Sequence, residues 1–209
     1  MKPLLLFDFD GTIVDSIDII LSAIKSVALN REIRLSVDKK VLANKGFEGL
    51  LRNSGVSIFR VSSFVSDCHQ EIEQTITQAG IHDHMKELLT QVSSYVDMCV
   101  VTSNSEQAVT NTLPEQVLLL FDGVYHAGPF SKHKVIRRLR RLYELKKSSV
   151  LYIGDESRDV HAARKAGVDS LAVTWGVQNK KSLLASRPTL LAQNATEAEH
   201  LIKAWIASR

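Results

Sequence analysis

The chain has 209 residues, 44% of them hydrophobic and 23% charged, and a formal net charge of +3. This composition is ordinary for a soluble globular protein, and the length suffices for one large domain or for a core with a modest insertion. The two cysteines, Cys68 and Cys99, lie far apart without metal-ligand spacing, which favours reduced packing residues over a disulfide or a metal site. The apolar run Leu4–Phe7 is too short for a signal peptide or a membrane span, so we expect a cytoplasmic protein without membrane contact.

The first predicted element is a buried strand over Leu4–Phe9 whose end carries two carboxylates. On an extended strand, residues i and i+2 point to the same side, so Asp8 and Asp10 are expected to aim at one point just past the strand. Two converging carboxylates repel each other unless a cation or a shared proton lies between them. This tip therefore predicts a site for a hard metal ion, with a nucleophile and an acid/base beside it.

The stretch from Asp15 to His84 contains no convincing strand and is predicted to be all-helical. Its predicted elements are a helix that Ser16 caps, a short helix over about Ser36–Ala43, a glycine-bracketed turn over Gly46–Gly49, another short helix that ends near Gly55, and a long amphipathic helix over Val61–Ala79 that Gly80 stops. We therefore expect a helical cap domain over residues 15–84, inserted into a core of residues 1–14 and 85–209.

Beyond this stretch, predicted helices and strands alternate along the chain. The predicted strands are Met98–Thr102, Phe121–Tyr125, Val150–Gly154 and Leu171–Thr174, and the predicted helices are Met85–Val92, Ser105–Thr112, His133–Leu145, Asp159–Ala166 and Ala198–Ile206. Such alternation implies parallel strands with right-handed crossovers and helices on both faces. The predicted fold is therefore α/β, with a doubly wound, mostly parallel, Rossmann-like sheet and a small all-helical cap domain after the first strand.

The segment Lys132–Lys147 concentrates positive charge, with eight Lys and Arg residues and one acid, Glu144. A basic stretch of this kind can be a nucleic-acid footprint. Apolar residues recur within it at helical spacing, however, and aromatic residues do not interleave with the arginines as a single-strand binder requires. We interpret the segment as the solvated face of a helix and expect no nucleic-acid partner.

Polar side chains and one glycine follow the predicted strands at the points where the strands end. They are Asp8, Asp10, Gly11 and Thr12 after the first strand, Ser103 and Asn104 after Thr102 at the end of the second, Lys132 in the segment after the third, and Asp155, Glu156 and Asp159 after the fourth. Active sites of doubly wound sheets lie at the carboxyl ends of the strands. We therefore expect these side chains to form one site.

In this order, the polar segments resemble the four motifs of the haloacid dehalogenase-like hydrolase superfamily. The matching segments are Asp8–Ser16, Val101–Asn104, Lys132 and Gly154–Asp159. The first and fourth are specific, and the resemblance covers nearly the whole chain outside the helical insertion. The segment from Gly154 to Gly167, followed by Val173–Gly176, is similar to the phosphoglycolate phosphatase-like branch, in which a helical cap follows the first strand.

The resemblance implies a two-step reaction at the first motif. Asp8 would attack the phosphorus of a phosphomonoester and become an aspartyl phosphate. Asp10 would protonate the leaving alkoxide and then help to activate water. Mg²⁺ would bind the Asp8 side chain, the Asp10 backbone carbonyl and the Asp155 side chain.

The same resemblance assigns the phosphoryl group to residues of the other motifs. Thr102 and Lys132 would hold it, with backbone N–H groups near Ser103 and Gly11 assisting. Asp159 would position metal-bound waters or Lys132.

Several of these residues also have a purely structural interpretation. Residues 102–104 alone would be a turn with a helix cap, and Asp159 is equally placed to cap the helix that follows it. Lys134 competes with Lys132 for the role of the third motif. Glu156 is expected to face solvent, and His82 is expected to be a surface residue beside the cap hinge.

These observations predict a Mg²⁺-dependent phosphatase that acts on a small phosphorylated metabolite, similar to phosphoglycolate phosphatases. A haloalkanoate dehalogenase of this family has no acid at the position of Asp10, so Asp10 favours phosphoryl chemistry. One alternative is a phosphomutase of the β-phosphoglucomutase-like type, with Lys45 and Arg52 holding a second phosphate. The other is a noncatalytic binding protein on the same scaffold, although none of the motif residues is lost. No exposed apolar stripe or heptad pattern argues for a particular oligomer.

Overall fold

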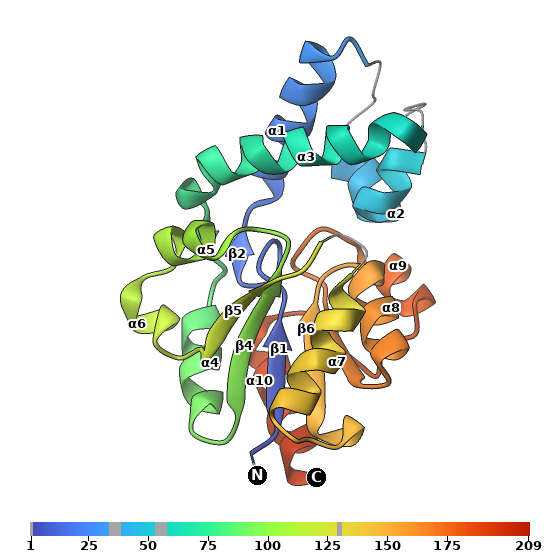
Figure 1. Ribbon diagram of the computed structural model, residues 1–209. Coiled ribbons are helices and arrows are strands. Elements are labelled where there is room, and N and C mark those ends of the chain that lie inside the picture. Colours follow the sequence, from blue (N-terminus) through green and yellow to red (C-terminus); the bar gives the residue numbers. More distant parts are fainter. Residues whose placement is uncertain (1, 34–38, 53–57, 129–130) are drawn as a thin grey trace.

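A six-stranded parallel sheet forms the centre of the computed structural model, which describes residues 2–33, 39–52, 58–128 and 131–209 (Figure 1). In order across the sheet, the strands are β5 (Gly123–His126), β4 (Asp97–Thr102), β1 (Leu4–Phe7), β6 (Val150–Gly154), β7 (Asp169–Val173) and β8 (Leu190–Ala192). All neighbouring strands are parallel. The doubly wound α/β sheet expected from the sequence is therefore confirmed.

Helices cover both faces of this sheet. They are α4 (Met85–Ser93) and α10 (Ala195–Ala207) on one face, and α7 (Lys132–Leu142) and α8 (Ser157–Ala166) on the other. Leu5 and Phe7 of β1 pack into the apolar cluster that contains α4 and α10, whereas Leu4 and Leu6 pack into the cluster that contains α7 and α8. A parallel strand between two helical layers has no solvent-facing side, which is why the first strand is a continuous apolar run.

Shorter elements complete the part of the fold around the sheet. They are α5 (Glu106–Thr112), α6 (Glu115–Leu118), α9 (Lys180–Ala185) and the 3₁₀ turns Ile76–Gln78 and Lys147–Ser149. The sequence did not predict α6, α9 or β8, because segments of 4, 6 and 3 residues are too short to show a helix or strand period. Other ends are shifted: α8 begins at Ser157 instead of Asp159, and β5 begins at Gly123 instead of Phe121.

Three further helices lie together above the carboxyl edge of the sheet (Figure 1). They are α1 (Ile17–Asn30), α2 (Lys39–Arg52) and α3 (Ile58–Thr75). This helical layer has its own apolar cluster, to which α1 contributes Ile24 and α3 contributes Cys68. Gly46 has a φ of 63° and breaks α2 into two helical pieces, at the glycine where a turn was expected. The helix ends expected near Ser36 and Gly55 lie outside the described residues.

A two-stranded ladder connects the helical layer with the sheet. β2 (Val14–Asp15) and β3 (Gly80–Ile81) pair in antiparallel fashion where the chain enters and leaves the layer. The expectation that no strand lies between Asp15 and His84 is therefore wrong. Strands of two residues show no alternation, and their hydrogen bonds join segments far apart in the sequence. The division into a core of residues 1–14 and 85–209 and a cap of residues 15–84 remains a prediction.

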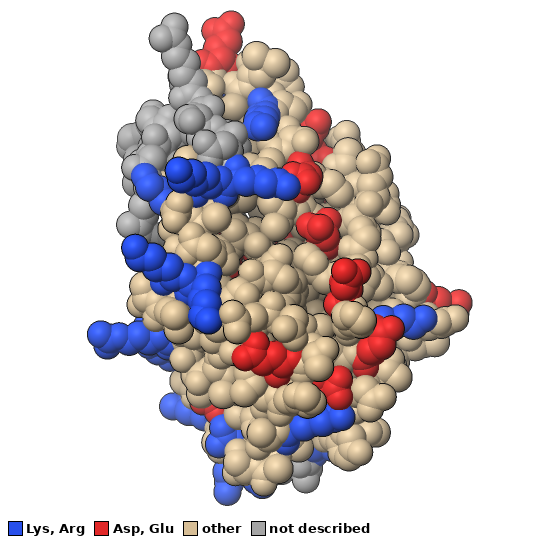
Figure 2. Space-filling model, turned by 180° about the vertical axis from the view of Figure 1, so that it is seen from behind, with Lys and Arg blue, Asp and Glu red and all other residues tan. Residues whose placement is uncertain are grey.

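The first part of the basic stretch forms α7, which has the two faces expected of a helix on a sheet. Ile136 and Leu139 are buried, while Arg137, Arg138 and Arg141 are exposed. On the other side of the molecule, Figure 2 shows Lys and Arg side chains and Asp and Glu side chains in separate small groups. No helix in the described part of the chain combines the length and the apolar character needed to span a membrane.

Candidate active site

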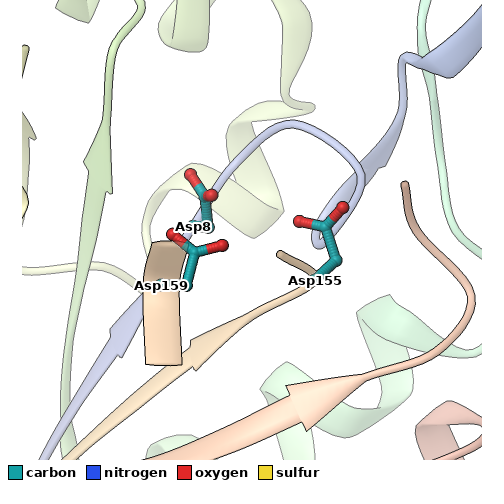
Figure 3. A group of neighbouring side chains, drawn as sticks. All are labelled: Asp8, Asp155 and Asp159. Carbon is teal, nitrogen blue, oxygen red and sulfur yellow. The ribbon is translucent and has the colours of Figure 1, made fainter. Parts of the chain in front are cut away.

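Three carboxylates meet at the carboxyl edge of the sheet. Asp8 directly follows β1, Asp155 directly follows β6, and Asp159 lies in the first turn of α8. One carboxylate oxygen of each lies within 4.8 Å of the others, and Figure 3 shows the three side chains pointing toward one another. Their exposed fractions are only 1–3%. Segments 147 positions apart therefore contribute acids to one buried point, because parallel strands bring their carboxyl ends to the same edge.

Lys132 is the cation of this group. Its Nζ lies 2.5 Å from Asp8 Oδ2 and 2.7 Å from Asp159 Oδ1, and its exposed fraction is 3%. Burial alone would lower the pKa of Lys132, but the charges of Asp159 and Asp8 outweigh burial and raise this pKa well above its ordinary value. Lys134 is exposed on the same helix. The geometry thus brings Lys132, and not Lys134, to the carboxylates.

The positive charge of Lys132 does not fully compensate the three carboxylates of this group. Burial raises the pKa of Asp8 to about 7, although Lys132 opposes this shift. Burial and then the charges of Asp8 and Asp159 raise the pKa of Asp155 well above its ordinary value. Three close carboxylates offer the hard oxygen donors that Mg²⁺ prefers, and a divalent cation would remove the repulsion among them. The donor set therefore fits a hard divalent metal ion.

Asp155 is held in a fixed orientation by two hydrogen bonds. Thr12 Oγ1 donates to Asp155 Oδ1 at 2.9 Å, and the Val177 N–H donates to Asp155 Oδ2 at 2.7 Å. A Cβ on Gly11 or on Gly176 would overlap with the Asp155 carboxylate. Gly11 also has a φ of 69°, a conformation that favours glycine. Both glycines therefore leave room for this carboxylate.

The Asp10 carboxylate lies outside the group of three. Ser16 Oγ donates to its Oδ1 at 2.9 Å, and Asn104 Nδ2 donates to its Oδ2 at 2.8 Å. Burial raises the pKa of Asp10 and so favours its protonated form. β1 ends at Phe7 and the chain then turns, so strand alternation does not extend to Asp10, and a common point for the Asp8 and Asp10 side chains stays a prediction. The metal role that the resemblance gives to the Asp10 backbone carbonyl stays a prediction.

The second motif lies at the end of β4, at the same edge. Thr102 is buried, and its Oγ1 accepts the Asn104 N–H at 3.1 Å, which leaves the hydroxyl hydrogen available to a ligand. Ser103 is half-buried and lines a small cavity together with Asp10. The turn expected as the structural alternative is thus present, and it also presents polar atoms to the site.

Asp159 combines the two interpretations that the sequence left open. Its Oδ2 accepts the Glu156 N–H at 3.0 Å in a capping box, while its Oδ1 accepts a hydrogen bond from Lys132 at 2.7 Å. The Asp159 carboxylate therefore both caps the first turn of α8 and holds the Lys132 ammonium next to Asp8.

Two features of the site were missed from the sequence. Glu156, expected to face solvent, is 4% exposed, and its Oε1 pairs with Arg158 Nη2 at 2.6 Å while its Oε2 accepts the Phe47 N–H at 3.0 Å. The sequence predicted no role for Arg158, although this residue lies within the fourth motif. The sequence contains two signals for these features: the opposite charges of Glu156 and Arg158 within the fourth motif, and Gly46 before Phe47. The contact between Glu156 and Phe47 joins segments that are distant in the sequence.

The other residues that the sequence singled out lie at the edge of the site or outside the described residues. His82, expected at the surface, is half-buried and contacts the Trp175 ring edge-to-face at 6.4 Å between centroids. Lys45 is exposed and lines an open groove with Arg158. The side chain of Arg52 lies outside the described residues.

Comparison with known proteins supports the same family. The sequence model of the haloacid dehalogenase-like hydrolases matches residues 5–173. A phosphoglycolate phosphatase of Synechococcus elongatus is 28% identical over 199 residues, which cover 92% of this chain and 93% of that protein. Phosphoglycolate phosphatase 1 of Pseudomonas aeruginosa is 23% identical over 213 residues, which cover 93% of this chain and 77% of that protein. A haloacid dehalogenase-like hydrolase of Streptococcus pneumoniae has the same fold, with a TM-score of 0.81, 24% identity, and coverage of 96% of this chain and 98% of that structure.

The chain therefore belongs to the haloacid dehalogenase-like hydrolase family, in the branch similar to phosphoglycolate phosphatases. It is an enzyme, a hydrolase of the phosphatase type.

Proposed function

We propose that this enzyme is a Mg²⁺-dependent phosphatase that hydrolyses a small phosphomonoester through an aspartyl phosphate on Asp8, and that phosphoglycolate is its substrate. The observation that carries the proposal is the buried group of Asp8, Asp155, Asp159 and Lys132. The names of the relatives from Synechococcus elongatus and Pseudomonas aeruginosa support the choice of phosphoglycolate.

In the first step, an Asp8 carboxylate oxygen forms a bond to phosphorus while the bond from phosphorus to the alkoxide oxygen breaks. Asp10 gives its proton to that oxygen, so the alcohol leaves neutral. In the second step, water attacks the phosphorus of the aspartyl phosphate, Asp10 takes a proton from the water, and inorganic phosphate leaves while Asp8 is restored.

Electrostatics make the first step difficult, because an anion attacks an anion. Two unit charges ~4 Å apart repel by about 4 kcal/mol at an effective dielectric near 20. The Lys132 ammonium, 2.5 Å from Asp8 Oδ2, offsets part of this repulsion. When bound, Mg²⁺ would be held by Asp8, Asp155 and the Asp10 carbonyl and would supply further positive charge near the phosphoryl oxygens.

Other residues of the edge would hold the phosphoryl group and shield it. The Thr102 hydroxyl and backbone N–H groups near Ser103 and Gly11 would donate to its oxygens. The helical layer α1–α3 would act as a cap that admits substrate and excludes bulk water during the reaction.

The test is phosphate release from phosphoglycolate and a panel of other phosphomonoesters, with Mg²⁺ and with EDTA. We expect release that requires Mg²⁺ and is lost in Asp8→Asn, which keeps the size of the side chain but removes the nucleophile. Asp18→Asn is the matched control, because Asp18 is a carboxylate on the surface of α1 and should leave the rate unchanged.

Phosphate release that survives EDTA or Asp8→Asn would contradict the proposed mechanism. Formation of an isomerised sugar phosphate without free phosphate would favour the phosphomutase alternative. Substrate binding without turnover in the wild-type protein would favour the noncatalytic one.

A further inference from the structure

A small cavity lies beside Asp10, between the helical layer and the loop after β6. Its wall includes Asp10, Phe47 of α2, His69 of α3 and Arg158 of α8. Because Asp10 would protonate the leaving oxygen, this cavity is where the alcohol part of the substrate would lie. We propose that Arg158 and His69 bind a carboxylate on that alcohol part, so that the enzyme selects short phosphomonoesters with a carboxylate end; this inference rests on the function proposed above.

The first argument is a set of polar atoms without partners. Arg158 Nε, His69 Nδ1 and Asn104 Oδ1 are buried and have no hydrogen-bond partner among the described residues, and all three residues line the cavity. Most buried polar atoms in proteins have a partner, so unpaired atoms around one cavity indicate a missing ligand. The three atoms lie on separate elements, α8, α3 and the loop after β4, and only the cavity brings them together.

The second argument is the chemistry of these atoms. Arg158 Nε carries a hydrogen on a permanent cation, which suits an anionic oxygen. Neutral His69 with its hydrogen on Nδ1 is a second donor, and burial followed by the charge of Arg158 lowers the pKa of His69 and keeps the ring neutral. Asn104 donates to Asp10 through Nδ2, so its Oδ1 is an acceptor, suited to the hydroxyl that the alcohol carries after protonation.

The third argument is that Arg158 is fixed in place before a ligand binds. Glu156 Oε1 pairs with Arg158 Nη2 at 2.6 Å, and Glu156 Oε2 in turn accepts the Phe47 N–H at 3.0 Å. The guanidinium therefore keeps its Nε–H free, and little side-chain freedom remains to be lost on binding.

The fourth argument is size. The cavity has a volume of about 40 Å³, which is room for a few water-sized groups, and Leu42, Phe47 and Ile72 form apolar parts of its wall. This small volume favours a two-carbon acid over a sugar or a second phosphate. The open groove beside Lys45 has about 460 Å³ and is the place where a larger anion would fit instead.

The experiment compares phosphoglycolate with its carboxamide analogue, phosphoglycolamide, which has nearly the same size and no charge on the alcohol part. We expect the wild-type enzyme to prefer phosphoglycolate in kcat/KM. Arg158→Gln should lower the ratio of the two kcat/KM values by roughly 10- to 100-fold, the effect of one charge-assisted hydrogen bond. His69→Gln should lower the ratio in the same direction by a smaller factor.

The matched control is Lys165→Gln, which removes a positive charge from an exposed position of the same helix and should leave the ratio unchanged. Thermal unfolding checks that each variant is folded. Arg158→Lys keeps the charge but has no Nε–H, and if Arg158→Gln does not fold, a lowered ratio in Arg158→Lys supports the inference and an unchanged ratio overturns it.

Equal losses on both substrates in Arg158→Gln would overturn the inference, because Arg158 would then act on the phosphoryl group. A wild-type enzyme that hydrolyses phosphomonoesters in a Mg²⁺-dependent way without preference for the carboxylate would also overturn it and would leave the proposed phosphatase function standing. If no phosphomonoester is hydrolysed at all, the proposed function itself fails and the inference falls with it.

Discussion

Replacement of Lys132 by Met tests the electrostatic core of the site. The Lys132 ammonium, 3% exposed, pairs with Asp8 and Asp159 at 2.5 and 2.7 Å, and both carboxylates are buried as well. Removing one partner of a buried ion pair typically costs 3–5 kcal/mol, because the remaining charge has neither water nor a counterion. Two carboxylates would be left here, so we expect Lys132→Met to lower the free energy of unfolding by about 3–5 kcal/mol in EDTA. Urea unfolding at pH 7, followed by far-UV circular dichroism, measures this change.

Lys134→Met is the matched control, because Lys134 lies two positions further along α7 and is exposed. A surface substitution of this kind changes the free energy of unfolding by about 0.5 kcal/mol or less. If the two variants are equally stable in EDTA, Lys132 does not neutralise the buried carboxylates and the reasoning is refuted.

Substitutions at three further positions test separate parts of the site. Asp155→Asn should stabilise the metal-free protein by about 1–2 kcal/mol, since one of three repelling charges disappears. It should also abolish the rise in melting temperature that Mg²⁺ causes in the wild-type protein. A destabilised variant whose melting temperature still rises with Mg²⁺ would contradict both expectations. Gly176→Ala should weaken Mg²⁺ binding and lower the free energy of unfolding by about 1–3 kcal/mol, because the new Cβ overlaps with Asp155. Calorimetric titration with Mg²⁺ measures the affinity, and an unchanged affinity would contradict this prediction. Glu156→Ala should speed hydrogen exchange at the Phe47 amide, whose acceptor it removes, whereas Glu156→Gln keeps an acceptor and should change exchange less.

Much of the site could be predicted because its residues are adjacent to strong local patterns. Asp8 and Asp155 each follow a buried apolar strand, and a parallel sheet brings such strand ends to one edge whatever lies between them in sequence. Lys132 was placed by the family resemblance alone, since its neighbour Lys134 has the same charge and nearly the same position. What separates the two lysines is the face of α7 on which each lies.

The remainder depended on contacts between distant segments. The environment of Glu156 is set by Phe47, 109 positions away, whose N–H follows the kink at Gly46 and donates to the Glu156 carboxylate. The β2–β3 ladder likewise depends on hydrogen bonds between short segments on either side of the helical layer. Ser16 lies at the N-cap position of α1 as expected, but its hydroxyl donates to Asp10 and makes no hydrogen bond to the helix. A serine hydroxyl can serve either purpose, and the sequence does not show which one it serves.

The balance of charge at the carboxyl edge explains why such an arrangement would need an ion to function. Four buried carboxylates face two cations there: Asp8, Asp155, Glu156 and Asp159 against Lys132 and Arg158. The formal charge of this set is −2, and the shortfall of positive charge is one reason why the pKa of Asp155 lies well above its ordinary value. Protons can fill the shortfall, but a protonated carboxyl is a poor nucleophile, whereas a divalent cation restores neutrality and leaves Asp8 ionised. The proposed metal requirement would thus follow from the burial of these acids next to apolar strands, whichever phosphomonoester the small cavity accepts.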